Sequence, residues 1–202
     1  MCAETDQMVY DRPDGEFVSR GGLKLAKALK AFHIDMTGSI VLDIGASTGG
    51  FTDCALKHGA RRVYAYDVGT DQLDIRLKND PRVISREQVN CRYLRKHDIE
   101  EPIDMIVMDV SFISCTKMLE AVSDILDPGK EAVILFKPQF EVGPQYLNGH
   151  GIVRDDKISL TRLEEVKAEM ADHRLKVIGT IVSPIKGKDG NTEYLMYLQK
   201  TE

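Results

Sequence analysis

The sequence predicts an α/β fold: a doubly wound, mostly parallel sheet of seven strands that ends in an antiparallel hairpin. Three observations lead to this fold class. Short apolar segments alternate with segments of helical periodicity along most of the chain. A run of small residues, DIGASTGG (43–50), lies where a turn between a strand and a helix is expected. Near the end the alternation stops, and two apolar segments follow each other without a helix between them.

The elements are predicted in chain order from these patterns. Leu25, Leu29 and Phe32 recur at helical spacing and predict a helix over 21–32. Apolar runs predict strands at 40–44, 62–66, 82–85, 104–109 and 131–137. The intervening segments predict helices at 49–58, 70–77 and 114–126. This alternation of strand and helix indicates parallel strands joined by crossover helices.

The last part of the chain predicts a different arrangement. Residues 157–172 read as a helix, and LKVIGTIVSPIKGKDGNTEYLMYLQ (175–199) then places two strands around a turn-rich loop. Two adjacent strands joined by such a loop form an antiparallel hairpin. A seven-stranded sheet that ends in this way is typical of Rossmann-like methyltransferases that use S-adenosylmethionine (SAM), and it distinguishes them from nicotinamide-binding domains.

Composition limits the classes of function. A chain of 202 residues is long enough for one well-filled domain. Its 27 basic and 32 acidic residues argue against a general nucleic-acid coat, so that any contact with nucleic acid has to be a local patch. The longest apolar run, 132–136, is far shorter than the roughly 18 residues of a spanning helix, which predicts no membrane segment and no signal peptide. Cysteines 2, 54, 91 and 115 lack CxxC spacing, which indicates free thiols in a reducing cytoplasm and no metal site.

The small-residue turn predicts a binding loop for a nucleoside. It fails the dinucleotide pattern GxGxxG at the second glycine, and no GK[ST] follows, which excludes a phosphate-binding P-loop. A relaxed acidic-x-G-x-G-x-G pattern fits, with Asp43, Gly45, Ser47 and Gly49. Asp67 ends the next strand, where a carboxylate accepts hydrogen bonds from both ribose hydroxyls of an adenosine. SAM fits this loop because it is a cation without phosphate. The alternative is that the glycines only make a tight turn.

Five motifs together resemble the TlyA or hemolysin A family, which are FtsJ-like methyltransferases of ribose 2′-hydroxyls in ribosomal RNA. They are SRGGLKLAKAL (19–29), DIGASTGGFTD (43–53), MDVSFIS (108–114), FKPQFE (136–141) and NTEYL (191–195). The resemblance covers residues 17–202 and implies an FtsJ-like methyltransferase domain over this range. Members of the family usually begin with an S4-type RNA-binding domain. Residues 1–16 are therefore expected to be a linker or the remnant of a missing N-terminal RNA-binding domain.

The resemblance implies a catalytic tetrad of Lys24, Asp109, Lys137 and Glu193. A ribose hydroxyl is a very weak acid, so methyl transfer to it needs a base and in-line placement. The pKa of a lysine side chain is about 10.4, and lysine serves as a base when burial or a neighbouring cation lowers this pKa. We expect Lys137 to be the base and the other three residues to position it. The alternative for any one of them alone is a structural ion pair at a strand end.

The cofactor site is predicted from the small-residue loop and from the resemblance. The segment EQVNCR (87–92) matches the side of the family's site that holds adenine, through Glu87, Asn90 and Arg92. The residues predicted to bind SAM are Asp43, Gly45, Ala46, Ser47, Gly49, Gly50, Phe51, Asp67, Val68, Glu87, Asn90 and Asp109.

Three basic groups are candidates for contact with RNA. In the helix 21–32, Lys24, Lys27 and Lys30 are predicted on the side opposite the apolar stripe, although a merely solvated lysine face is an equal alternative. A second run consists of Arg82, Arg86, Arg92, Arg95 and Lys96, and Lys186 and Lys188 form the third group. The residues predicted to bind RNA phosphates are Arg20, Lys27, Arg92, Lys186 and Lys188.

The sequence therefore predicts a cytoplasmic, SAM-dependent methyltransferase that acts on ribosomal RNA or ribosomal subunits, without indicating an oligomeric state. Two alternatives stay open: a SAM-binding module without catalysis, and a methyltransferase of small molecules or proteins. A membrane-damaging cytolysin needs an amphipathic or apolar insertion element, and the sequence contains none.

Overall fold

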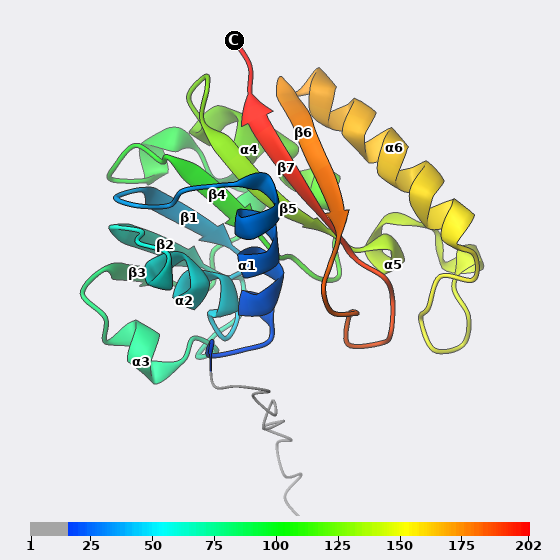
Figure 1. Ribbon diagram of the computed structural model, residues 1–202, viewed down its shortest axis with the longest axis horizontal. Coiled ribbons are helices and arrows are strands. Elements are labelled where there is room, and N and C mark those ends of the chain that lie inside the picture. Colours follow the sequence, from blue (N-terminus) through cyan, green and yellow to red (C-terminus); the bar gives the residue numbers. More distant parts are fainter. Residues whose placement is uncertain (1–15) are drawn as a thin grey trace, which may run out of the picture.

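The computed structural model describes residues 16–202 and confirms the predicted mixed sheet. Cys2 and nearly all of the predicted linker 1–16 lie outside the described residues. The strands run in the order β3-β2-β1-β4-β5-β7-β6 (Figure 1). Their bounds are β1 Ile40–Ile44, β2 Arg62–Tyr66, β3 Val83–Arg86, β4 Met105–Met108, β5 Glu131–Phe136, β6 Leu175–Val182 and β7 Tyr194–Lys200. The pairs formed among β1 to β5 are parallel, whereas β7 pairs antiparallel with both β5 and β6, as the predicted hairpin requires.

Helices cover both faces of this sheet (Figure 1). Their bounds are α1 Gly21–Phe32, α2 Gly50–Lys57, α3 Ile75–Lys78, α4 Leu119–Ile125, α5 Pro138–Glu141 and α6 Asp156–Asp172. Four short 3₁₀ turns also occur among the described residues: η1 Cys91–Tyr93, η2 Lys96–Asp98, η3 Cys115–Met118 and η4 Pro144–Tyr146.

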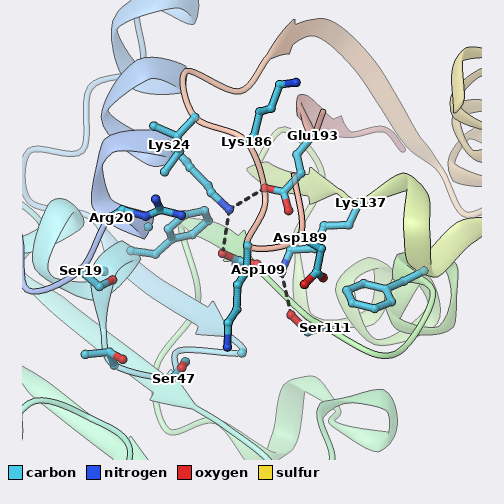
Figure 2. A pocket seen from close by; sticks show the side chains of 18 of the residues that line it. Ser19, Arg20, Lys24, Ser47, Asp109, Ser111, Lys137, Lys186, Asp189 and Glu193 are labelled. Atoms are coloured by element: carbon cyan, nitrogen blue, oxygen red, sulfur yellow. Dashed lines mark hydrogen bonds and ion pairs between the residues drawn. The ribbon is translucent and has the colours of Figure 1, made fainter. Parts of the chain in front are cut away.

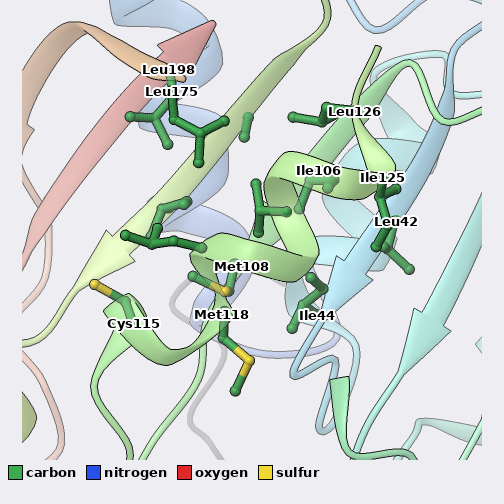
Figure 3. Packing of buried hydrophobic residues seen from close by; sticks show 14 of the residues in the cluster. Leu42, Ile44, Ile106, Met108, Cys115, Met118, Ile125, Leu126, Leu175 and Leu198 are labelled. Carbon is green, nitrogen blue, oxygen red and sulfur yellow. The ribbon is translucent and has the colours of Figure 1, made fainter. Parts of the chain in front are cut away.

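The core is split by the sheet into two clusters. On one face, Leu25 of α1 and Phe51 of α2 belong to the same cluster as Val41 of β1. On the other face, Ile125 of α4 belongs to a cluster with Leu42 of β1 (Figure 3). Successive strand residues point to opposite faces, so neighbouring residues of β1 enter different clusters. Burial on both faces explains why β1 reads as an apolar run, interrupted only by the buried Asp43.

Two helices differ from their prediction. The helix expected over 70–77 is the single turn α3, Ile75–Lys78, because the Asp74 side chain accepts a hydrogen bond from the Arg76 backbone and caps the helix there. Asp71 also has a positive φ of 54°, which is incompatible with a helix at that point. The helix expected over 114–126 begins as η3 and continues as α4.

The parallel strands bring the predicted site residues to one edge of the sheet. Gly45 follows β1, Asp67 follows β2, Asp109 follows β4 and Lys137 follows β5. The carboxyl ends of parallel strands meet at the same edge, where open α/β sheets bind their ligands. Glu193 arrives at this edge directly before β7, which is antiparallel and therefore starts where β5 ends.

Candidate active site

Two adjoining pockets open at the carboxyl edge of the sheet. The β2 pocket, of about 450 Å³, lies beside the ends of β1 and β2 and includes Asp67 and Asn90. The β5 pocket, of about 360 Å³, lies between α1 and the end of β5 and includes Lys24 and Lys137. The wall between them is shared by Gly45, Ser47, Asp109, Ser111 and Phe112. A ligand that fills the β2 pocket up to this wall therefore adjoins a second ligand in the β5 pocket.

The four residues predicted as a tetrad form one connected network in the β5 pocket (Figure 2). Lys24 Nζ donates to Glu193 Oε2 at 2.6 Å and lies 3.9 Å from Asp109 Oδ2. Lys137 Nζ lies 2.5 Å from Asp109 Oδ1 and donates to Ser111 Oγ at 2.7 Å. Asp109 thus joins the two lysines, while Glu193 holds Lys24 from the other side.

This network is largely removed from water. The Lys24 and Lys137 side chains are each 10% exposed, Glu193 is 2% exposed and Asp109 is 21% exposed. Two lysines and two carboxylates balance in formal charge. Burying four charged groups carries a desolvation cost that mutual attraction offsets only with close geometry, so a buried network is weak support for stability and is typical of functional sites.

Lys24 does not share the exposed face on which the sequence placed it with Lys27 and Lys30. Lys27 and Lys30 are exposed, but Lys24 is buried. Its neighbours on the helix surface include Ala28, four residues on, which is fully buried. Lys24 therefore lies on the inner side of α1, where Glu193 compensates its charge.

The small-residue loop after β1 is shaped for a close approach to β4. Gly45 has a φ of +81°, and a Cβ at this position would lie 2.6 Å from the carbonyl oxygen of Asp109. Asp67 holds the same loop: its Oδ2 accepts from the Ser47 amide and its Oδ1 from the Gly69 amide, both at 2.7 Å. Each carboxylate oxygen keeps a further lone pair, with which Asp67 can bind a ligand in the β2 pocket.

The predicted cofactor residues fall into three groups. Those that line the β2 pocket are Gly45, Ser47, Asp67, Val68, Asn90 and Asp109. Those that line the β5 pocket instead are Ala46, Gly50 and Phe51. Asp43, Gly49 and Glu87 line neither pocket.

The residues of the third group have other neighbours. The Asp43 side chain is fully buried and accepts a hydrogen bond from Thr52 Oγ1 at 2.6 Å. Gly49 has a φ of +101° and lies against Leu73 and Leu77, where a Cβ would clash. Glu87 lies 3.3 Å from Lys78, and the backbone amide of Asp71 lowers the pKa of its carboxyl group.

The structure adds residues that the sequence did not single out. Phe112 is 91% exposed on the shared wall, with a positive φ of 63° and its ring centroid 5.2 Å from that of Phe140. Ser111 binds Lys137, and Gln139 lines the β5 pocket. Their signal was their place within the motifs MDVSFIS and FKPQFE, which was read only for its charged residues.

Comparison with known families agrees with this geometry. Residues 17–200 match the family described as FtsJ-like methyltransferase. The chain belongs to the FtsJ-like methyltransferase family. The match spans both pockets and all seven strands, and it confirms the resemblance carried by the five motifs.

Close relatives of this FtsJ-like chain have names that refer to ribosomal RNA. The putative rRNA methyltransferase YqxC of Bacillus subtilis is 44% identical over 183 residues, which cover 90% of this chain and 65% of YqxC. The 16S/23S rRNA (cytidine-2′-O)-methyltransferase TlyA of Mycobacterium tuberculosis is 40% identical over 91% of this chain and 68% of TlyA. A solved putative hemolysin from Streptococcus thermophilus superposes with a TM-score of 0.89 at 49% identity, covering 92% of this chain and 68% of that one. The chain thus spans about two thirds of the length of these relatives.

The basic residues of the FtsJ-like domain are distributed unevenly around the pockets. Arg20, Lys186 and Lys188 line the β5 pocket, and Lys27 lies on the exposed side of α1. Within residues 16–202 none of these four forms an ion pair. Arg92 lies apart from them on η1, with its guanidinium 5.6 Å from the ring centroid of Tyr93.

The second basic run is largely neutralised by ion pairs, most of them with residues 14 or more positions away. Its ion pairs are Arg82–Asp80, Arg86–Glu100, Arg95–Glu120 and Lys96–Asp127. These paired side chains offer little free positive charge to an RNA, so this run does not form the patch that the sequence indicated.

The described residues contain neither a membrane-crossing helix nor a metal-binding cluster. No helix between residues 16 and 202 combines the length and hydropathy that crossing a membrane requires. Over the same range, no group of three or more His, Cys, Asp or Glu side chains is arranged to hold a metal ion. Cys54, Cys91 and Cys115 are free and buried.

Proposed function

We propose that this FtsJ-like methyltransferase transfers a methyl group from SAM to a ribose 2′-hydroxyl of ribosomal RNA. The observation that carries the proposal is the buried Glu193–Lys24–Asp109–Lys137 network beside the wall shared by two pockets. A two-substrate transfer needs two adjoining pockets, and a weakly acidic hydroxyl needs a base at their junction. The names of YqxC and TlyA support ribosomal RNA as the substrate class.

The β2 pocket fits the adenosyl part of SAM. Asp67 would accept from ribose hydroxyls while it holds the loop through Ser47, and Val68 and Asn90 would border the adenine. The pocket offers carboxylates rather than phosphate-binding groups, which suits a cation. SAM, when bound, supplies the methyl group from its sulfonium.

The residues of the β5 pocket have different roles in the transfer. Lys137, as the neutral amine, accepts the proton of the ribose hydroxyl as this oxygen takes up the methyl group. Asp109 and Ser111 orient the Lys137 side chain. Glu193 fixes Lys24, which faces the same cavity. Lys24 then contacts the ribose or its phosphate as a positioning group.

We further propose that the unpaired cations guide RNA to the pocket. Arg20, Lys186 and Lys188 line the β5 pocket, and Lys27 and Arg92 extend the contact on either side. Such contacts bind phosphates without reading sequence. We propose ribosomal RNA or ribosomal subunits as its partners and the cytoplasm as its location.

The direct test offers labelled SAM with separate ribosomal subunits, naked ribosomal RNA and protein fractions. We expect label in RNA, and we expect the labelled RNA to resist alkaline cleavage at the modified nucleotide, because a methylated 2′-oxygen cannot attack the adjacent phosphate. Label only in protein or small molecules would contradict the proposal. Cleavage at the labelled nucleotide would assign the methyl group to a base.

Lys137→Ala tests the proposed base. We expect methyl transfer to fall by about 10² to 10⁴, the usual contribution of general-base catalysis. SAM affinity, measured by calorimetry, should remain because Lys137 lines only the β5 pocket. Lys30→Ala removes an exposed lysine from α1 outside both pockets and serves as the control. Full activity of Lys137→Ala would exclude Lys137 as the base.

A further inference from the structure

Glu141 is a buried carboxylate that lines neither pocket. Its side chain is only 2% exposed and lies at the end of α5. Glu141 Oε2 accepts from Ser114 Oγ at 2.6 Å, and Oε1 accepts from the Cys115 backbone amide at 2.7 Å. Arg162 of α6 approaches it at 3.9 Å. These contacts with the segment that follows β4 compensate the desolvation of the Glu141 carboxylate.

That segment, residues 109–115, carries three of the five residues of the shared wall, and α5 with its N-cap contacts it at several points. Directly before α5, its N-cap residue Lys137 lies against Asp109 and Ser111. In the middle, Phe140 packs on Phe112. At the end, Glu141 holds Ser114 and Cys115. The single turn of α5 thus supports the loop on both sides of the shared wall.

The loop needs such support because its backbone is strained. Phe112 has a positive φ of 63°, a conformation that side chains of its size rarely adopt and that persists only when the surroundings hold it. The ring of Phe112 is almost fully exposed, so its own burial does not fix it. Support has to come from residues before and after it, and Glu141 binds Ser114 and Cys115, two and three residues after Phe112.

We propose that Glu141 is a positioning residue that fixes the loop 109–115 and thereby places Asp109 and Ser111 against Lys137. The proposal rests on the proposed methyl transfer and adds to it a contact outside the pockets that sets the geometry inside. Displacements of about 1 Å in a catalytic arrangement can cost about 10²-fold in rate. A tether that prevents such displacement is therefore visible in kcat.

The test uses Glu141→Ala, Glu141→Gln and the control Glu165→Ala. Glu165 pairs with the same Arg162 at 3.0 Å but is not a partner of the loop. We expect Glu141→Ala to lower kcat at saturating SAM and RNA by about tenfold or more. Glutamine can accept from the Cys115 amide and donate to Ser114, so Glu141→Gln should recover most of the rate. Glu165→Ala should retain the wild-type rate, and an equal loss in this control would overturn the proposal.

Coupling to Asp109 separates positioning from general destabilisation. If Glu141 acts through the loop, Glu141→Ala should cost little further activity in an Asp109→Asn background, because Asp109 no longer supports the base. An equal loss in both backgrounds would overturn the proposal. Should Glu141→Ala fail to fold, Ser114→Ala removes one of the two hydrogen bonds and should lower kcat in the same direction, by about threefold.

Hydrogen exchange of the Cys115 amide tests the tether without any activity. We expect faster exchange at Cys115 and across 109–115 in Glu141→Ala than in the wild type, with α2 unchanged. Unchanged exchange in the loop would overturn the proposal. If the wild type transfers no methyl group to RNA, the proposed function fails, while this measurement still decides whether Glu141 holds the loop.

Discussion

Asp43 is a carboxyl group enclosed by the protein directly before the small-residue loop. It is 0% exposed, and only one of its oxygens has a hydrogen-bond partner, Thr52. Burial raises the pKa of Asp43 to about 7, and the nearby carboxylates of Asp109 and Asp67 act in the same direction, against the hydrogen bond from Thr52. The folded protein therefore keeps a proton on Asp43 at pH values where the unfolded chain has lost it.

Asp43→Asn should reveal this proton in the pH dependence of stability. In the wild type, the raised pKa of Asp43 stabilises the folded state fully below about pH 4. This stabilisation is lost as the pH rises to about 7, because over this range the folded state binds more protons than the unfolded state. The stability of Asp43→Asn relative to the wild type should therefore increase over this range, by at most about 4 kcal/mol. Urea unfolding at a series of pH values measures the free energy of unfolding of both proteins. Parallel plots of this free energy against pH would contradict a raised pKa of Asp43.

Gly45 and Gly129 allow backbone strain to be separated from close contact. Both have a positive φ, +81° and +84°, but a Cβ on Gly129 meets nothing within 4 Å, whereas one on Gly45 would clash with Asp109. Gly129→Ala should cost only the conformational penalty of about 1 to 2 kcal/mol and retain the rise in melting temperature that SAM produces. Gly45→Ala should cost more and lose that rise. A full response to SAM in Gly45→Ala would show that the loop tolerates the displacement.

The positions of the proposed catalytic side chains were better predicted than their partners. The motifs indicated that Lys24, Asp109, Lys137 and Glu193 lie together, and the structure brings them together. They did not indicate that Lys24 lies closer to Glu193 than to Asp109, at 2.6 Å against 3.9 Å. That choice depends on the course of the loop before β7, which has no periodic pattern in the sequence.

At the level of elements, α1 carries lysines of two kinds. Lys24 is buried in the β5 pocket, whereas Lys27 is exposed and unpaired within residues 16–202. Lys27→Gln should weaken RNA binding without changing the rate at saturating RNA. Removing one phosphate contact should lower the slope of log affinity against log salt concentration by about one.

Lys96→Gln is the matched control for this experiment. Lys96 is also exposed, but it pairs with Asp127 at 2.5 Å. The substitution changes the net charge by the same amount as Lys27→Gln and should leave the salt slope nearly unchanged. An equal effect of the two substitutions on binding would contradict the division between free and paired cations.

Elements with strong patterns were predicted, and the short helix α5 was not. β1 and β5 are buried on both faces and therefore read as apolar runs, and α1 has the bounds that its spacing predicted. α5 has only four residues, too few for a periodic signal, and it is held by contacts with the loop 109–115 rather than by its own propensity.

Over the whole molecule, the fold could be predicted from the sequence, whereas the distribution of free positive charge on the surface could not. Alternating strands and helices predicted a parallel sheet, and a parallel sheet collects its strand ends at one edge. The net charge of −5 gave no indication of where free cations lie. The basic run 82–96 is paired with acidic residues such as Glu120 and Asp127, up to 31 positions away, and only the folded chain brings them together.

The place of β7 between β5 and β6 has a consequence for the chain as it is made. β6 is synthesised first, yet β7 is its only neighbour in the described sheet. A nascent chain that stops before β7 exposes the backbone of β6, the kind of open edge that pairs with other chains. The same chain lacks Glu193, which directly precedes β7. Pairing of the open edge of β6 and completion of the four-residue network therefore depend on the same segment, and a nascent chain that lacks β7 has neither.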